Sequence, residues 1–359
     1  MTSPDIRRPG AIDAAWLTGV LQNAGVDAVV KSFEAKNVGT GQIGESVRFK
    51  LAYERDAEDA PRSLVGKFPS PDDTSRATGI MLGNYLREVR FYQQLAPRAR
   101  VQTPRCWFTD TDATGSEFVL MMEDLAPAEQ GDQLKGVTLD QARLVVEQAA
   151  RLHGSFWGDE GLDELPWVQG SKAAPPSAAT PEMVKGLWQA FRARYAPRLK
   201  PHWIEVGEAI TSRWGRFGDI HEGPKSLAHH DFRPDNMMFG TPAGGYPVTV
   251  LDWQSFTYAP GATDVAYFLA GALPPDVRRV HEAELLALYL AELERLGVAD
   301  YSMDDLRRDY GRGGFQLFLT AFFAAMVVIQ TERGDNMFMQ MLGSAADHIL
   351  DHQALAALA

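Results

Sequence analysis

Six polar residues fall within eight positions of the stretch LAHHDFRPDNMMFG, residues 227–240, and apolar residues follow at once. A dense polar group between hydrophobic flanks is typical of a metal site, an acid/base site or a surface turn. A metal hydrolase would need the adjacent side chains to converge on one ion. Neighbouring side chains diverge in a strand or loop, so this group makes a poor coordination set. The six residues are His229, His230, Asp231, Arg233, Asp235 and Asn236.

The spacing of Asp231 and Asn236 suits phosphoryl transfer. The Asp231 carboxylate can accept the proton of an incoming hydroxyl, and an amide oxygen five residues later can ligate a divalent cation. Arg233 can lie against the transferring phosphoryl group as its charge redistributes. The pattern His229-x-Asp231-x-x-x-x-Asn236 is expected by chance in roughly one chain in a hundred of this length.

A second carboxylate, Asp252, ends the short apolar strand predicted in PVTVLDWQSF. It follows Asn236 by sixteen residues, across the glycine-bearing turn GTPAGG, which predicts a hairpin. An isolated aspartate at a strand end usually caps a turn. Its place after Asn236 favours a metal ligand instead, because Mg²⁺ prefers hard oxygen donors.

Three features earlier in the chain could hold a nucleotide. Lys67 lies in the apolar strand SLVGKFP, where a lysine usually extends its side chain to solvent. Glu88 lies on the helix predicted to follow that strand, and its alternative interpretation is a residue on the solvated face of the helix. If the two side chains pair, Glu88 would hold Lys67 where it can bridge nucleotide phosphates. The glycines of VGTGQIGESVRFKL would let backbone N–H groups approach phosphate oxygens, a weak signal alone. These glycines are Gly39, Gly41 and Gly44.

Together these residues resemble the protein-kinase-like phosphotransferases of the aminoglycoside phosphotransferase and choline kinase superfamily. HHDFRPDNMMFG followed by VLDWQSFTYAPGATDVAYFL is most similar to the branch that contains the ecdysteroid-kinase-like enzymes. The resemblance spans about residues 38–269. It implies a bilobal fold with ATP bound between the lobes and Mg²⁺ as the metal.

The resemblance also implies a role for each matching residue. Asp231 is expected to be the catalytic base, and Asn236 and Asp252 the metal ligands. Lys67 and Glu88 are expected to form the phosphate clamp.

Further roles are implied for a hinge and for supporting residues. The segment MMEDL, residues 121–125, is expected to offer backbone hydrogen bonds to adenine from Met122, Glu123 and Leu125. Asp264 is expected to brace the catalytic loop, and His229 to prop it. Trp253-Gln254 replaces the Phe-Gly of protein kinases, so no glycine-enabled flip is expected there. His230 stands where this family frequently has glycine, and we expect it to pack beside the loop.

The elements that must position these residues divide into two parts. Period-two alternation and turn residues predict two strands joined by a glycine-bearing turn over 32–55 and further strands over 62–68, 101–110 and 117–125, with one helix over 78–96. From about residue 137 the spacing is helical, with a Thr138 cap and a buried helix at Phe315–Ile329. We therefore predict an α+β, bilobal protein-kinase-like fold. A small antiparallel β lobe (1–125, leading helix 11–24) precedes a mostly helical lobe (126–359), which carries the catalytic loop 229–236 and the metal segment 250–256.

Composition narrows the function classes. An apolar fraction of 45% and a charged fraction of 23% are ordinary for a globular protein with a substantial core. The net charge of −12 argues against nucleic-acid and anionic-membrane binding, which need a positive field. Cys106 is the only cysteine, so an intramolecular disulfide is excluded. The apolar segment 315–329 is shorter than the roughly 18 to 20 residues of a membrane span, and we expect a cytoplasmic protein.

These observations favour a small-molecule kinase that moves the γ-phosphate of ATP to a hydroxyl. A protein kinase is disfavoured because only eleven residues separate Asp252 from Asp264 and no Ala-Pro-Glu follows. A catalytically silent nucleotide-binding module has no chemical need for Lys67, Asp231, Asn236 and Asp252 together. The identity of the phosphate acceptor stays open. The acidity of the chain suits a polycationic aminoglycoside, whereas the Trp, Phe and Met content of the helical part suits a sterol-like alcohol.

Overall fold

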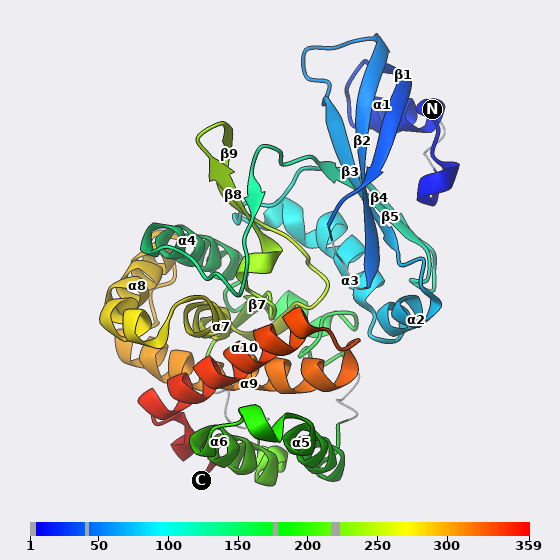
Figure 1. Ribbon diagram of the computed structural model, residues 1–359. Coiled ribbons are helices and arrows are strands. Elements are labelled where there is room, and N and C mark those ends of the chain that lie inside the picture. Colours follow the sequence, from blue (N-terminus) through cyan, green and yellow to red (C-terminus); the bar gives the residue numbers. More distant parts are fainter. Residues whose placement is uncertain (1–4, 40–42, 175–178, 217–222) are drawn as a thin grey trace. The chain divides into compact units, whose positions relative to one another are not determined.

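The computed structural model describes residues 5–39, 43–174, 179–216 and 223–359 and divides them into two compact units (Figure 1). Unit 1 comprises residues 1–128, 243–245 and 249–255, and unit 2 comprises 129–242, 246–248 and 256–359. The expected α+β fold class is confirmed. Three stretches expected in the second lobe group with unit 1 instead: residues 126–128, 243–245 and 249–255, the last of which carries Asp252.

Unit 1 is built on a five-stranded antiparallel sheet of order β1-β2-β3-β5-β4. Alternation creates its buried face, because Val47, Phe49 and Leu51 of β2 are buried while Lys50 between them is exposed. Helix α1 (Ala14–Asn23), which is capped by Asp13, contributes to the same core. The strands are β1 (Val29–Asn37), β2 (Gly44–Arg55), β3 (Ser63–Pro69), β4 (Cys106–Thr111) and β5 (Phe118–Glu123).

The single helix expected over 78–96 is divided in two. Helix α2 spans Asp73–Met81 and α3 spans Asn84–Arg90, and α3 continues into a wider helical turn at Phe91–Leu95. The break is at Gly83, whose φ of 69° is left-handed and ends the regular helical path. Glycine makes this conformation inexpensive, and the apolar periodicity continues across it, which is why the pattern alone indicated one helix.

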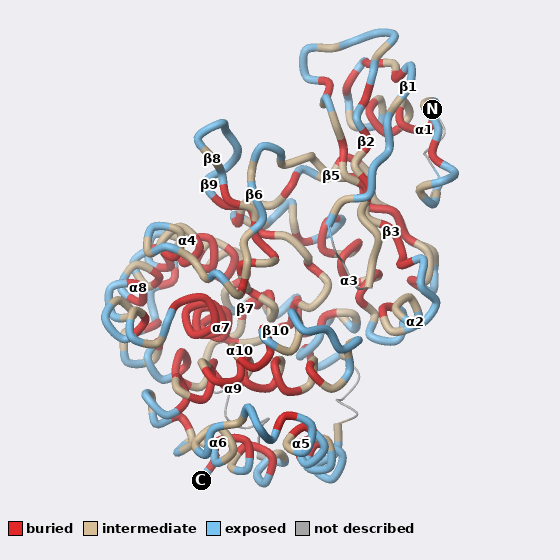
Figure 2. The backbone as a smooth tube through the Cα atoms, in the orientation of Figure 1, coloured by how far each residue is buried: buried red, intermediate tan, exposed pale blue. Residues whose placement is uncertain are grey.

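Unit 2 is mostly helical, with a core formed by side chains of α5, α6, α9 and α10. Thr138 caps α4 as expected, because its hydroxyl accepts the Gln141 N–H and the Gln141 side chain accepts the Thr138 N–H. Helix α7 is buried along its entire length (Figure 2). The helices are α4 (Leu139–Ser155), α5 (Pro181–Tyr195), α6 (Pro201–Ser212), α7 (Ala262–Ala272), α8 (Pro275–Arg295), α9 (Met303–Val327) and α10 (Glu332–Asp351).

Most of the apolar segment Phe315–Ile329 lies in α9, but only seven of its fifteen residues are buried. The helix stops at Val327, and both Val327 and Ile329 are exposed. Within the described ranges, no helix has the length and apolar character needed to cross a membrane.

Short strands flank the polar stretch at residues 229–236. Strand β7 (Lys225–Ala228) pairs with β10 (Thr257–Pro260), and neither was expected because each has only four residues. The expected hairpin is formed by β8 (Met237–Thr241) and β9 (Gly244–Val250), and β6 (Glu129–Gln130) extends it in the order β6-β8-β9. The loop at 229–236 therefore connects β7 of one small sheet to β8 of another.

Candidate functional site

The structure brings together three of the candidate residues within unit 1. Lys67 lies on β3, the central strand of the sheet, and its Nζ is 2.9 and 2.7 Å from the two carboxylate oxygens of Glu88 on α3. The same Nζ is 2.6 Å from Asp252 Oδ1. The Glu88 side chain is only 2% exposed, whereas that of Asp252 is 26% exposed. Lys67 is thus held between one buried and one partly hydrated carboxylate.

The charges of this group follow from burial and pairing. Burial alone would lower the pKa of Lys67, but the carboxylates of Asp252 and Glu88 outweigh it, so the pKa is raised and the side chain stays cationic. Burial raises the pKa of Glu88, and the Lys67 charge opposes that rise. The arrangement keeps a fixed positive charge on the central strand, between two carboxylates.

The segment around Asp252 is held firmly in unit 1. Trp253 is fully buried and stacks on Phe91, with ring centroids 3.9 Å apart and an interplanar angle of 4°. Arg87 donates a hydrogen bond to the Gln254 carbonyl. Asp252 has a φ of 64°, a left-handed conformation that non-glycine residues adopt at some cost and that is common at functional sites.

The expected phosphate loop is described only at its two ends. Gly39 has a φ of 77°, which suits glycine, and Gly41 lies outside the described residues. Gly44 begins β2, and a Cβ there would lie 3.1 Å from the Phe68 carbonyl and 3.5 Å from Cε of Lys67. The absence of a side chain at Gly44 therefore leaves the approach to Lys67 open.

The expected adenine segment includes the end of β5. Met122 pairs with Val65 on β3, and the Glu123 N–H donates to the Arg105 carbonyl at 2.8 Å, so that particular N–H is already used. Leu125 follows, and its carbonyl accepts the Ala128 N–H.

Asp124 lies between Glu123 and Leu125, and the sequence did not predict its contacts. Its carboxylate is 2.7 Å from Nε of Arg48 and accepts the Ser63 hydroxyl at 2.6 Å. Ser63 and Arg48 are separated from it by 61 and 76 positions, so no local pattern indicates this contact.

In unit 2, the loop between β7 and β8 presents Asp231. The hydroxyl of Tyr267, on α7, donates to Asp231 Oδ1 at 3.0 Å, and Nδ2 of Asn236 donates to Oδ2 at 2.8 Å. Nε of Arg233 is 3.0 Å from Oδ1. Both carboxylate oxygens are therefore oriented by their neighbours. Tyr267 was missed, although it lies three residues after Asp264 and therefore on the same side of a helix.

The electrostatics favour an ionised Asp231. Burial would raise its pKa, but the positive charge of Arg233, the neighbouring His229 and the hydrogen bonds from Asn236 and Tyr267 together lower it. A carboxylate with a lowered pKa is deprotonated at neutral pH and able to accept a hydrogen bond from a hydroxyl.

A buried network on α7 and α4 fixes the loop backbone. Asp264 accepts the N–H of His229 at 2.5 Å and the N–H of His230 at 2.9 Å. Nε2 of His153 is 3.1 Å from the same carboxylate, and the other ring nitrogen of His153 is 2.8 Å from the Tyr289 hydroxyl. His153 and Tyr289 were also missed, since they lie 111 positions from Asp264 and 136 positions from His153, respectively.

The two adjacent histidines have different structural roles. His229 is buried, and its Nδ1 accepts the Asp231 N–H at 3.3 Å. His230 has a φ of 67°, which is left-handed, and its N–H is held by Asp264. The left-handed turn explains why glycine suits this position, and histidine is one of the residues that tolerate it best.

Asn236, in unit 2, and Asp252, in unit 1, were each expected to ligate Mg²⁺. Asn236 uses its Nδ2 for two hydrogen bonds, to the carbonyl and to the carboxylate of Asp231, so its Oδ1 takes no part in these two bonds. Asp252 supplies a partly exposed carboxylate. An amide oxygen and a carboxylate are hard donors of the kind that Mg²⁺ binds.

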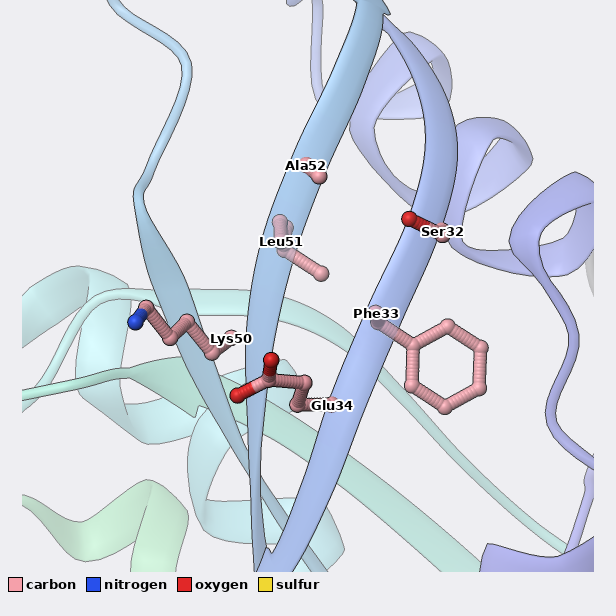
Figure 3. Close-up of a pocket in the computed structure, with 6 residues that line it drawn as sticks. All are labelled: Ser32, Phe33, Glu34, Lys50, Leu51 and Ala52. Atoms are coloured by element: carbon pink, nitrogen blue, oxygen red, sulfur yellow. The ribbon is translucent and has the colours of Figure 1, made fainter.

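One hollow of the surface lies elsewhere in unit 1 (Figure 3). It lies on β1 and β2, and none of the candidate site residues lines it. Its lining consists of Ser32, Phe33, Glu34, Lys50, Leu51 and Ala52.

Comparison with known proteins identifies the family. Residues 48–311, more than half of the chain, match the model of the phosphotransferase enzyme family. No curated protein matches the chain by sequence. Among solved structures, a protein from Ralstonia eutropha JMP134 classed with the aminoglycoside phosphotransferases is 14% identical, with a TM-score of 0.53, and the match covers 95% of this chain and 98% of that one. An ethanolamine kinase from Plasmodium vivax is 11% identical, with a TM-score of 0.51 and coverages of 87% and 81%. At these identities the two structures bear on the fold, and the family match carries the assignment: the chain belongs to the phosphotransferase enzyme family.

Proposed function

We propose that this phosphotransferase is a small-molecule kinase that transfers the γ-phosphate of ATP to a hydroxyl group, with Asp231 as the base. The observation that carries the proposal is the environment of Asp231. Its carboxylate is oriented by Tyr267 and Asn236 and is kept ionised by Arg233. Such a carboxylate orients an acceptor hydroxyl and takes its proton as the new P–O bond forms.

Arg233 has a second part in this proposal. Its guanidinium is always charged, and it lies 3.0 Å from the Asp231 carboxylate. We propose that it stabilises the phosphoryl group as negative charge redistributes during transfer. The Asp264 network supports both residues indirectly by fixing the backbone at His229 and His230.

The residues of unit 1 supply the nucleotide contacts in the proposal. Lys67, held by Glu88, would bind ATP phosphates, and the backbone at Gly39, Gly41 and Gly44 would approach them. The backbone of the segment 122–125 would bind adenine. Asn236 and Asp252 would hold Mg²⁺, which when bound neutralises phosphate charge. The ion pair between Lys67 and Asp252 would then be exchanged for contacts with the nucleotide and metal.

The segment between Asp252 and Asp264 supports a small-molecule acceptor over a protein. Four of its residues form β10, and each pairs with a residue of β7. A segment already paired in this way leaves little chain for a phosphorylatable activation loop.

The proposed acceptor is a hydroxyl compound. One sequence feature that favoured a sterol-like alcohol has another explanation in the structure. The aromatic and methionine residues that suggested a sterol-like alcohol are mostly core, among them Trp188, Phe191, Phe338 and Met341. They are therefore explained by packing. Aminoglycosides, amino alcohols and other alcohols remain the set to be tested.

The test is ADP release from ATP and Mg²⁺ across a panel of these hydroxyl compounds. With the best acceptor, Asp231→Asn is expected to lower kcat by several orders of magnitude while leaving ATP binding nearly unchanged, because the loss falls on the transition state. Asp300→Asn, which removes an exposed carboxylate of unit 2, is the control. Turnover by Asp231→Asn at the wild-type rate would refute the assignment of the base, and acceptor-independent ATP hydrolysis alone would refute the kinase assignment.

A further inference from the structure

Two imidazoles and one carboxylate converge in unit 2, and none of them belongs to the sets described above. Glu282 lies on α8, His348 lies on α10, and His352 follows the end of α10 directly. One ligand atom of each lies within 4.8 Å of the others. We propose that Glu282, His348 and His352 bind a divalent transition-metal cation of the Zn²⁺ class.

The protonation of His348 leaves a ligand nitrogen without a partner. Its Nε2 is 2.9 Å from the backbone carbonyl of Tyr310, which can only accept, so Nε2 carries the proton. Nδ1 therefore presents its lone pair, and it is fully buried with no hydrogen-bond partner among the described residues. A buried polar atom without a partner requires an explanation, such as a bound ion. A metal-binding histidine typically donates its other ring N–H to a backbone carbonyl in this way.

The orientation of the His348 ring places Nδ1 away from α9. A Cβ at Gly314, on α9, would lie 2.4 Å from Cδ2 of His348, so the Cδ2–Nε2 edge of the ring faces that helix. Nδ1 is on the opposite edge. A Cβ at Gly311 would likewise lie 2.9 Å from Cβ of His352. Glycine weakens a helix interior, and these two glycines of α9 give both imidazoles their space.

The Glu282 carboxylate is held by neighbours through one of its oxygens. Oε2 is 2.6 Å from Nη1 of Arg278, accepts the Tyr310 hydroxyl at 3.2 Å and is 3.3 Å from Nε2 of His352. These contacts orient the carboxylate and leave Oε1 as the ligand atom. Such supporting hydrogen bonds are a regular feature around metal-binding carboxylates.

The opposing charge at this site is that of Arg278, whose Nη1 is also 3.4 Å from Nε2 of His352. Asp351 balances it, because both Arg278 and Arg279 bind the Asp351 carboxylate. Two guanidinium groups thus face two carboxylates, those of Glu282 and Asp351. An incoming cation therefore meets no uncompensated positive charge.

Two imidazole nitrogens and one carboxylate oxygen form a donor set of the Zn²⁺ type, with a fourth position for water. Neighbouring ligand atoms in a tetrahedral site are about 3.4 Å apart, given metal–ligand distances near 2.1 Å. The present separations of up to 4.8 Å must therefore shorten on binding. His352 can supply this movement because it lies beyond the last turn of α10. The bound ion would join α8 to α10 and stabilise the folded chain by mass action.

The experiment uses the full chain, stripped with a chelator and then dialysed against Zn²⁺ in an excess of Mg²⁺. Metal analysis should find about one Zn²⁺ per chain, and Zn²⁺ should raise the Tm by several degrees. Cobalt-loaded protein should show the visible absorption of a low-coordinate Co²⁺ site. His352→Gln should lose all three signals. His281→Gln, which removes the histidine beside Glu282 on α8, is the matched control and should keep them.

Because His352 is partly exposed, its replacement is expected to leave the fold intact, and circular dichroism and the metal-free Tm check this. The proposal is overturned if the wild-type chain retains no more Zn²⁺ than His352→Gln. It is also overturned if His281→Gln loses the ion as well, because binding would then reflect scattered surface histidines. None of these readouts depends on kinase activity.

Discussion

Replacing Lys67 by methionine tests how the nucleotide-side residues are held. Lys67 is the cation paired with Glu88, whose side chain is 2% exposed, and with the more hydrated Asp252. Removing one partner of a buried ion pair costs about 3 to 5 kcal/mol, since the remaining charge is left without compensation. Asp252 keeps part of its hydration, so Glu88 dominates the loss. We therefore expect Lys67→Met to lower the free energy of unfolding by about 3 kcal/mol at pH 7.5.

The loss of unfolding free energy in Lys67→Met should increase as the pH rises. Burial already raises the pKa of Glu88, and removing Lys67 removes the positive charge that opposes this rise. The folded variant then binds a proton more tightly than the unfolded chain, so its stability falls as pH rises. The slope is at most about 1.4 kcal/mol per pH unit for one group. Between pH 5.5 and 7.5 the destabilisation should therefore grow by up to about 2.7 kcal/mol.

Chemical denaturation at the two pH values measures both effects. The double variant Lys67→Met/Glu88→Leu removes both charges and should recover most of the stability lost in the single variant, while leaving ATP binding impaired. Lys50→Met, at an exposed position of β2, is the control and should change the stability little. The reasoning is refuted if Lys67→Met is as stable as the control at pH 7.5, or if adding Glu88→Leu makes the protein less stable still.

Two further predictions concern the loop that carries Asp231. Tyr267→Phe removes the hydroxyl that donates to Asp231 Oδ1, so the pKa of Asp231 should rise and the acid limb of the kcat/KM profile should move to higher pH; a purely structural role would lower stability without moving this limb. His230→Gly relieves the left-handed strain of about 1 to 2 kcal/mol but adds the chain entropy of glycine, about 0.5 to 1 kcal/mol. The unfolding free energy should therefore change by less than about 1 kcal/mol, whereas His230→Val, β-branched at the same φ of 67°, should clearly destabilise the protein in thermal unfolding. A fully stable His230→Val would contradict this account.

Local patterns in the sequence were sufficient for some of the elements, among them β2 and α4. The alternation at Val47, Phe49 and Leu51 predicted β2, and the Thr138 cap predicted the start of α4, because each depends on residues close in the chain. The same reasoning failed at Gly83, where the apolar spacing continues through a break in the helix. It also failed at β7 and β10, since four residues are too few for a period to show.

The candidate site residues could be named from the sequence, but their contacts could be predicted only in part. The pairing of Lys67 with Glu88 was suggested by the order of strand and helix, whereas the contact of Lys67 with Asp252 spans 185 positions and was not. The contacts of His153 and Tyr267 with aspartates 111 and 36 positions away were likewise missed. Such contacts are set by the packing of distant segments, and one sequence carries no periodic signal for them.

The assignment of Thr249–Ser255 to unit 1 has a consequence for the modularity of this chain. A fragment ending at Ala128 would contain the complete five-stranded sheet but would lack Asp252 and Trp253. Its Lys67 would lose one of its two carboxylates, and the ring of Phe91 would lose the tryptophan that covers it. The segment that completes unit 1 is encoded more than a hundred residues downstream, inside the sequence of unit 2. Unit 1 is therefore not a transferable cassette, and exchanging parts between relatives would have to move residues 249–255 together with the sheet.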